Sequence, residues 1–85
     1  MSDELLSELL DAVEQQLVSP QTKYVPKTFQ RLLKAGLEED EAKRQIACCL
    51  SEEMFEIVRL KRPFDEKAYR AALDELPLEP EEDAE

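Results

Sequence analysis

The sequence predicts a compact all-α domain of four helices, with a long central third helix and a disordered acidic C-terminal tail. Apolar residues recur at intervals of three and four along four separate segments, which is typical of helices packed on a core. The 85 residues include a single glycine and no tryptophan, and most segments are rich in good helix formers. A hydrophobic content of 42% is high enough for a folded chain. We therefore expect one small domain over residues 1–76.

The longest predicted helix runs from Glu38 to Lys61, and it is the one segment long enough to contact all the others. Four acids at its start complement the helix dipole, and basic residues precede Pro63 at its end. Cys48 and Phe55 lie roughly opposite its main apolar face. That face consists of Ala42, Ile46, Cys49, Leu50, Met54, Ile57 and Leu60.

A first helix is expected to begin with Ser2 or Asp3 as its N-cap and to stop near Val18, because Ser19 precedes a proline. Its apolar stripe consists of Leu5, Leu6, Leu9, Leu10, Val13 and Leu17.

The second helix has two possible starts. Either Thr22 caps a helix that contains Pro26 in its first turn, or Pro26 takes the first helical position. The helix should run to about Ala35 and bury Phe29, Leu32 and Leu33. Gly36 stands where a left-handed residue ends a helix, and Leu37 would then contact Leu32 as in a Schellman motif.

The last helix should begin at Asp65, whose carboxylate can cap it. Phe64 and Tyr69 have the spacing of a hydrophobic staple, and Pro77 ends the segment. Residues 77–85 contain two prolines and five acids, which predicts a disordered tail. The inward face of this helix consists of Tyr69, Ala72, Leu73 and Leu76.

The formal charge of −10 disfavours nucleic acids and anionic membranes as partners and favours a basic protein. No segment approaches the ~18 apolar residues of a membrane span, and the N-terminus lacks the pattern of a signal peptide. The adjacent thiols of Cys48 and Cys49 diverge on a helix, so a disulfide between them is geometrically disfavoured. Free thiols fit a reducing compartment, and we expect a cytoplasmic protein.

The residue types argue against an enzyme, a metal site and a cofactor. The chain contains no histidine, the usual acid–base group near neutral pH and the usual partner of a nucleophilic thiol. Cys48 and Cys49 lie in mid-helix, away from the N-terminal dipole that lowers thiol pKa values. Periodicity places Cys49 in the core and leaves Cys48 as the more exposed thiol. Without histidine or spaced cysteines zinc has no ligand set, and the acids lack the glycine-containing loop of an EF-hand.

Two surfaces of the predicted fold are candidates for binding. The first surrounds Phe55, with Cys48, Glu52 and Arg59 beside it on the third helix. Either the last helix folds back and covers this patch, or Phe55 is an exposed anchor for a partner or for a second copy in a C2 dimer. The sequence therefore favours a non-enzymatic helical protein-interaction module, with self-association as one form of it.

The second surface is a basic stripe, which we define as Lys23, Lys27, Arg31 and Lys34. It raises the alternative of a nucleic-acid or phosphate contact, and the helices around Gly36 have the order of a helix-turn-helix. The helix that would enter the groove begins with four acids at residues 38–41, however, which phosphates would repel. We expect the stripe to pair instead with acids of the first helix or of a partner.

Several short motifs carry a resemblance over roughly residues 20–77. They are Tyr24-Val25 before Phe29-x-x-Leu32, then Glu41-Ala42-Lys43-x-x-Ile46-Ala47, Arg62-Pro63-Phe64-Asp65-Glu66-x-x-Tyr69 and Leu73-x-x-Leu76-Pro77. Together they are similar to small bacterial all-helical proteins with no assigned function. This resemblance implies a bacterial cytosolic protein and carries over no functional residue. The turn Ala35-Gly36-Leu37 also resembles the first loop of ubiquitin-associated domains.

Overall fold

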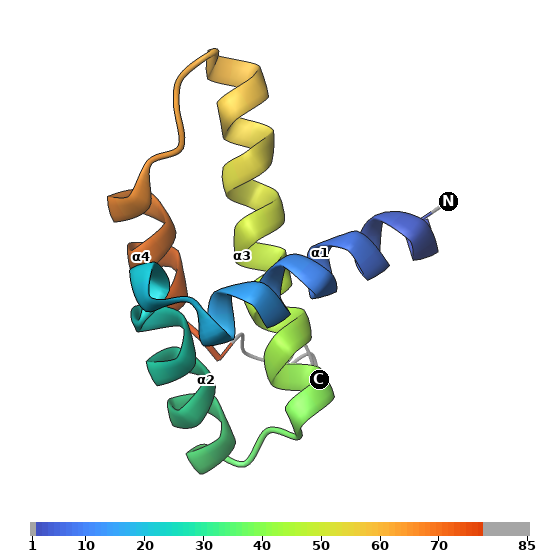
Figure 1. The fold of residues 1–85 in the computed structure, drawn as a ribbon, viewed down its shortest axis with the longest axis vertical. Helices are drawn as coiled ribbons and strands as arrows, with labels where there is room; N and C mark the ends of the chain where they lie inside the picture. The colour runs from blue at the N-terminus through green and yellow to red at the C-terminus, as the bar shows by residue number, and fades with distance from the viewer. Residues whose placement is uncertain (1, 78–85) are drawn as a thin grey trace, which may run out of the picture.

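The computed structural model describes residues 2–77, which form four α-helices and one short 3-10 helix (Figure 1). The α-helices are α1 (Ser2–Val18), α2 (Tyr24–Lys34), α3 (Glu39–Leu60) and α4 (Glu66–Asp74), and the 3-10 helix η1 (Pro20–Thr22) joins α1 to α2. The predicted all-α class, the four helices and the long third helix are confirmed. The predicted tail lies outside the described residues except for Pro77. None of the described helices is long and apolar enough to cross a membrane.

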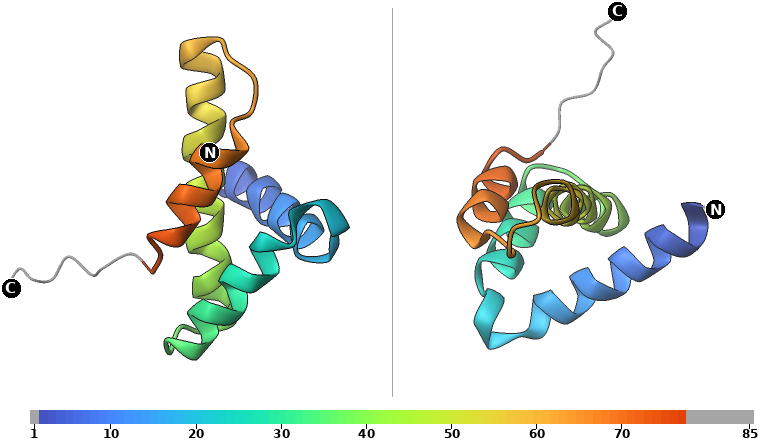
Figure 2. Two further views of the ribbon diagram at one scale, coloured as in Figure 1. Left: turned by 90° about the vertical axis from the view of Figure 1, so that its left-hand side faces the viewer. Right: turned by 90° about the horizontal axis from the view of Figure 1, so that it is seen from above.

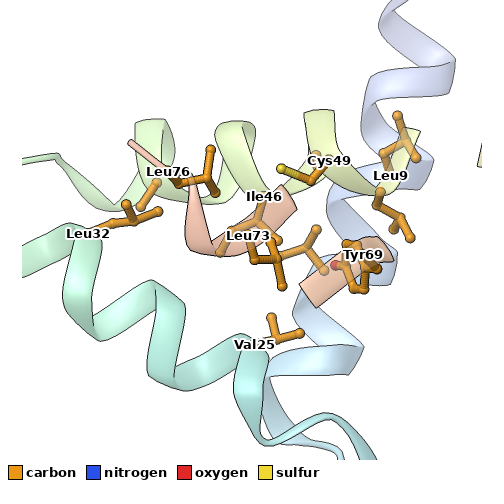
Figure 3. Packing of buried hydrophobic residues seen from close by; sticks show 12 residues of the cluster. Leu9, Val25, Leu32, Ile46, Cys49, Tyr69, Leu73 and Leu76 are labelled. Atoms are coloured by element: carbon orange, nitrogen blue, oxygen red, sulfur yellow. The ribbon is translucent and has the colours of Figure 1, made fainter. Parts of the chain in front are cut away.

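The core forms where the three other α-helices meet the N-terminal two thirds of α3. α1 crosses α3, whereas α2 and α4 pack against each other and against α3 (Figures 1 and 2). Figure 3 shows apolar side chains from all four helices pointing toward one another. The buried cluster consists of Leu9, Val13, Val25, Leu32, Ala42, Ile46, Ala47, Cys49, Leu50, Tyr69, Leu73 and Leu76.

The start of α2 differs from both of the expected alternatives. Pro26 lies in the first turn, as the first alternative required, but Thr22 does not cap the helix. Its hydroxyl donates instead to the backbone carbonyl of Gln16, at 2.7 Å. The N-cap is Lys23, which is already in a helical conformation and makes no side-chain cap. Because η1 leads directly into α2, the extended backbone that a capping side chain needs is not formed there.

The other helix boundaries follow local sequence signals. α2 ends in a Schellman motif, in which Gly36 N–H donates to Leu33 O and Leu37 N–H donates to Leu32 O. Gly36 has the positive φ of 106° that this ending requires. Asp65 caps α4 by accepting a hydrogen bond from Ala68 N–H at 3.2 Å. The rings of Phe64 and Tyr69 make an edge contact, with 5.6 Å between their centroids, which confirms the predicted staple.

The C-terminal half of α3 is less covered than its periodicity predicted. Met54 and Leu60, assigned to the main apolar face, are 47% and 50% exposed, and Ile57 is only half-buried. On α1, Leu5 and Leu6 are exposed as well. The reason is length, because α3 extends beyond the region where α1 and α2 cross it (Figure 1). The apolar pattern marks a helix face, but it does not say how far along the helix neighbours will cover that face.

A buried ion pair holds the connection between α3 and α4 against α3. Glu53 is 5% exposed, and both of its carboxylate oxygens accept hydrogen bonds from the guanidinium of Arg62, at 2.7 and 3.0 Å. The same carboxylate accepts the backbone N–H of Asp65 at 2.8 Å. The chain turns sharply here because Lys61 adopts a left-handed conformation, with φ 54°. Arg62 lowers the pKa of Glu53, and the Asp65 N–H lowers it further.

We expect the substitution Glu53→Gln to destabilise the fold by about 1–3 kcal/mol at pH 7, because it removes the charge from a buried hydrogen-bonded pair. The lowered pKa means that ionised Glu53 stabilises the fold above its unfolded pKa of about 4.3, and that this contribution is lost as the pH falls through the folded value. Urea unfolding of both proteins between pH 7 and pH 3 should therefore show a difference that shrinks with acid. Glu14→Gln, in an exposed pair with Lys43, is the control and should cost much less. A difference independent of pH would contradict this account.

We expect Gly36→Ala to destabilise the fold by about 1–2 kcal/mol, because alanine tolerates a positive φ poorly. An added Cβ would meet no atom within 4 Å, so the cost comes from the backbone and not from a clash. Gly36→Asn is the matched variant and should cost less, since asparagine tolerates this conformation better. Thermal unfolding monitored by circular dichroism measures the stability of both variants. Equal losses of stability would contradict the explanation.

Candidate interaction surface

Tyr69 fixes the position of α4 against the other helices. Its side chain is 1% exposed, and its ring makes edge contacts with Phe64 and with Tyr24 of α2. Its hydroxyl donates to the side-chain carbonyl of Gln16 in α1, at 2.6 Å. Burial raises the pKa of Tyr69, so the hydroxyl keeps its proton and remains a donor. α4 is therefore tied to α1 and α2 while it packs beside α3.

The patch around Phe55 is not covered by α4, although α4 packs against α3. The Phe55 side chain is 63% exposed and lies at a groove of about 530 Å³ between the two helices, which we call the α3–α4 groove. Its apolar lining consists of Cys49, Phe55, Ala68, Tyr69 and Ala72, and its polar lining consists of Ser51, Glu52, Glu53, Glu56 and Arg62. From α4 the groove is lined by two alanines and the buried Tyr69, and the Phe55 ring stays exposed beside them.

The α3–α4 groove has a negative local charge. Glu53 and Arg62 neutralise each other, whereas Glu52 is exposed and forms no ion pair among the described residues. Glu56 is partly exposed and binds the exposed Arg59 at 2.7 Å. At the floor, burial raises the pKa of the Cys49 thiol to about 11, and the negative charges of Glu52 and of Glu75, which follows α4, add to this effect. The thiol is therefore neutral at pH 7, and the carboxylates that line the groove, those of Glu52, Glu53 and Glu56, all come from α3.

The predicted interface residues are only partly brought together. Phe55 and Glu52 line the groove, and Arg59 reaches it through Glu56. Cys48 is exposed, as predicted, but it lines a separate hollow of about 320 Å³ between α1 and α3, together with Leu6 and Leu9 of α1. The four residues therefore do not form one continuous site.

Sequence reasoning missed the contribution of α4 to this surface. Ala68 and Ala72 form the opposite wall of the groove, and they are one helical turn apart. This spacing of two alanines was a signal that another helix can approach α4 closely. Which side of α3 faces these alanines depends on tertiary packing.

The basic stripe on α2 has a different role from the one expected. Its four members are exposed, but Arg31 is anchored, since its guanidinium donates to the carbonyl of Leu73 at 2.8 Å and to that of Leu76. Leu73 is the second-last residue of α4 and Leu76 follows the helix, so Arg31 joins α2 to the C-terminal end of α4. Among the described side chains, none of the stripe forms an ion pair with α1, and pairing with acids of a partner stays a prediction. Arg31 stabilises α4 instead.

A smaller hollow of about 260 Å³ lies between α2 and α4, beside the stripe. Its charged lining consists of Lys27, Arg31, Arg70 and Asp74. The guanidinium carbon of Arg70 lies over the ring of Tyr24, 5.0 Å from its centroid. Burial raises the pKa of Tyr24 to about 12, and a hydrogen bond with Glu66 adds to the rise. Two of the three cations in this hollow are thus already engaged, and two acids lie close by.

We expect Arg31→Ala to destabilise the fold by about 1–3 kcal/mol, because it removes the two guanidinium hydrogen bonds that join α2 to the C-terminal end of α4. Lys27→Ala removes the same charge from the neighbouring turn of the stripe and should change stability by less than about 0.5 kcal/mol. Urea unfolding at neutral pH compares the two variants. If both variants lost the same stability, Arg31 would stabilise the fold only through its charge and not through its hydrogen bonds.

The chain matches no family model, no curated protein and no solved structure. The resemblance to small bacterial helical proteins, and that of the Gly36 turn to ubiquitin-associated domains, therefore stay predictions. What the surface can do is inferred from its geometry.

Proposed function

We propose that this protein is a non-enzymatic interaction module whose α3–α4 groove receives a helix of a partner protein. The observation that carries the proposal is the position of Phe55, an aromatic side chain that is 63% exposed at the edge of an apolar groove. Exposing a large aromatic ring to water is unfavourable, and aromatic residues are frequent anchors of protein interfaces.

The surroundings of Phe55 support binding by a helix. Met54 and Val58, on the same half of α3, are also exposed, so the apolar surface extends beyond the groove. Two walls, one from α3 and one from α4, suit the helix-in-groove mode of recognition. The contacts of Tyr69 and Arg31 hold α4 in place, so little ordering is needed before a partner binds.

The alternative function, a nucleic-acid or phosphate contact through the basic stripe, has less support. Arg31 is engaged with the carbonyls of α4, and Asp74 lines the hollow beside it. Phosphate binding would require free cations in greater number than the acids around them. Because Cys48 and Cys49 are both free thiols, we also propose a reducing, cytoplasmic location.

The proposal is tested by panning a phage library of helical peptides against the immobilised full chain. We expect enriched peptides whose binding is weakened at least ~10-fold by Phe55→Glu, because the substitution places a charge at the apolar contact. Val18→Glu is the matched control, since Val18 is 82% exposed on α1 and does not line the groove. Circular dichroism should show that both variants remain helical. Failure to enrich any helical peptide, or enrichment of peptides that bind Phe55→Glu equally well, would refute this function.

A further inference from the structure

We infer that the partner of the α3–α4 groove is a cationic amphipathic helix of another protein, with apolar residues on one face and Lys or Arg at its margins. This inference rests on the proposed function and adds the chemistry of the partner. It is carried by the juxtaposition of an apolar floor with the carboxylates of Glu52, Glu53 and Glu56, which line the groove from α3 and outnumber the cations that pair with them.

Both walls of the groove contribute apolar surface, but their side chains differ in size. On α3, Phe55 and Cys49 contribute apolar surface, with Glu52 beside them. On α4, Ala68 and Ala72 contribute a wall of short side chains, which lets a helix approach closely. An apolar residue in each successive turn of a partner helix would fill this groove.

The carboxylates that line the groove outnumber the arginines that pair with them. Glu52 lines the groove and has no ion-pair partner among residues 2–77. It is also close enough to the floor to raise the pKa of the Cys49 thiol. Arg62 is held by the buried Glu53, and Arg59 is a single exposed cation opposite Glu56. A partner with positive residues flanking its apolar face is therefore electrostatically complementary.

A second copy of this chain fits the groove less well. A two-fold contact through Phe55 would bring Glu52 and Glu56 of one copy close to the same residues of the other, and each chain carries a net charge of −10. The basic stripe lies on α2, so in a symmetric contact it would not face these acids. A different protein with basic side chains avoids this repulsion.

The test uses three synthetic helical peptides with the same leucine face and with Lys, Gln or Glu on the polar margins. Fluorescence anisotropy with the full chain should show that the Lys peptide binds roughly tenfold more tightly than the Gln peptide, and that the Glu peptide binds most weakly. Added salt should weaken the Lys peptide selectively. Equal affinity of the Lys and Gln peptides, with both dependent on Phe55, would overturn the inference and leave the proposed function standing.

Matched variants locate the charge effect. Glu52→Gln combined with Glu56→Gln should weaken the Lys peptide roughly tenfold and leave the Gln peptide unchanged. Glu39→Gln combined with Asp40→Gln removes the same charge from exposed residues at the other end of α3 and should have little effect. If this control pair weakens binding as much, only net charge matters and the inference is wrong.

Two further outcomes separate this inference from the function on which it rests. If none of the three peptides binds, or if Phe55→Glu leaves their binding unchanged, the proposed function fails as well. If sedimentation shows that the wild type is a dimer and that Phe55→Glu is a folded monomer, the occupant of the groove is a second copy and the cationic partner is ruled out.

Discussion

The side chain of Tyr69 connects the parts of this fold that lie furthest apart in the sequence. Its ring contacts Tyr24 on α2 and Phe64 before α4, and its hydroxyl donates to Gln16 on α1. Burying a phenol without a partner for its hydroxyl would be unfavourable, so the hydrogen bond to Gln16 makes this central position possible. The placement of α4, and with it the α3–α4 groove, depends on this set of contacts.

The length of α3 then determines which surface remains open. The other helices pack against its N-terminal two thirds, whereas the connection to α4, and not a helix, runs beside its C-terminal part (Figure 1). A domain of this size cannot cover a helix of 22 residues on every face, so Phe55, Val58 and Leu60 remain exposed. The cations of α2 are used partly in holding α4, whereas carboxylates border the apolar groove. The same chain is thus apolar and acidic where it is open to a partner.

Much of the fold could be predicted because its boundaries depend on local chemistry. Gly36 ends α2 since glycine adopts a positive φ easily, and Asp65 begins α4 since its carboxylate reaches the Ala68 N–H. Periodicity also separated buried Cys49 from exposed Cys48, because adjacent residues on a helix point about 100° apart. Within the candidate site, the sequence identified Phe55 and Glu52.

The sequence by itself therefore determined the helices, most of their ends and the apolar face of each, since these follow from interactions within a few residues. Tertiary structure decided what each face meets. It placed Arg31 on the carbonyls of α4, buried Glu53 against Arg62, and left Met54 and Leu60 exposed. It also brought Ala68 and Ala72 opposite Phe55 to form the groove. These outcomes depend on how helices distant in sequence cross, and helical periodicity specifies which residues share a face but not which neighbour covers it.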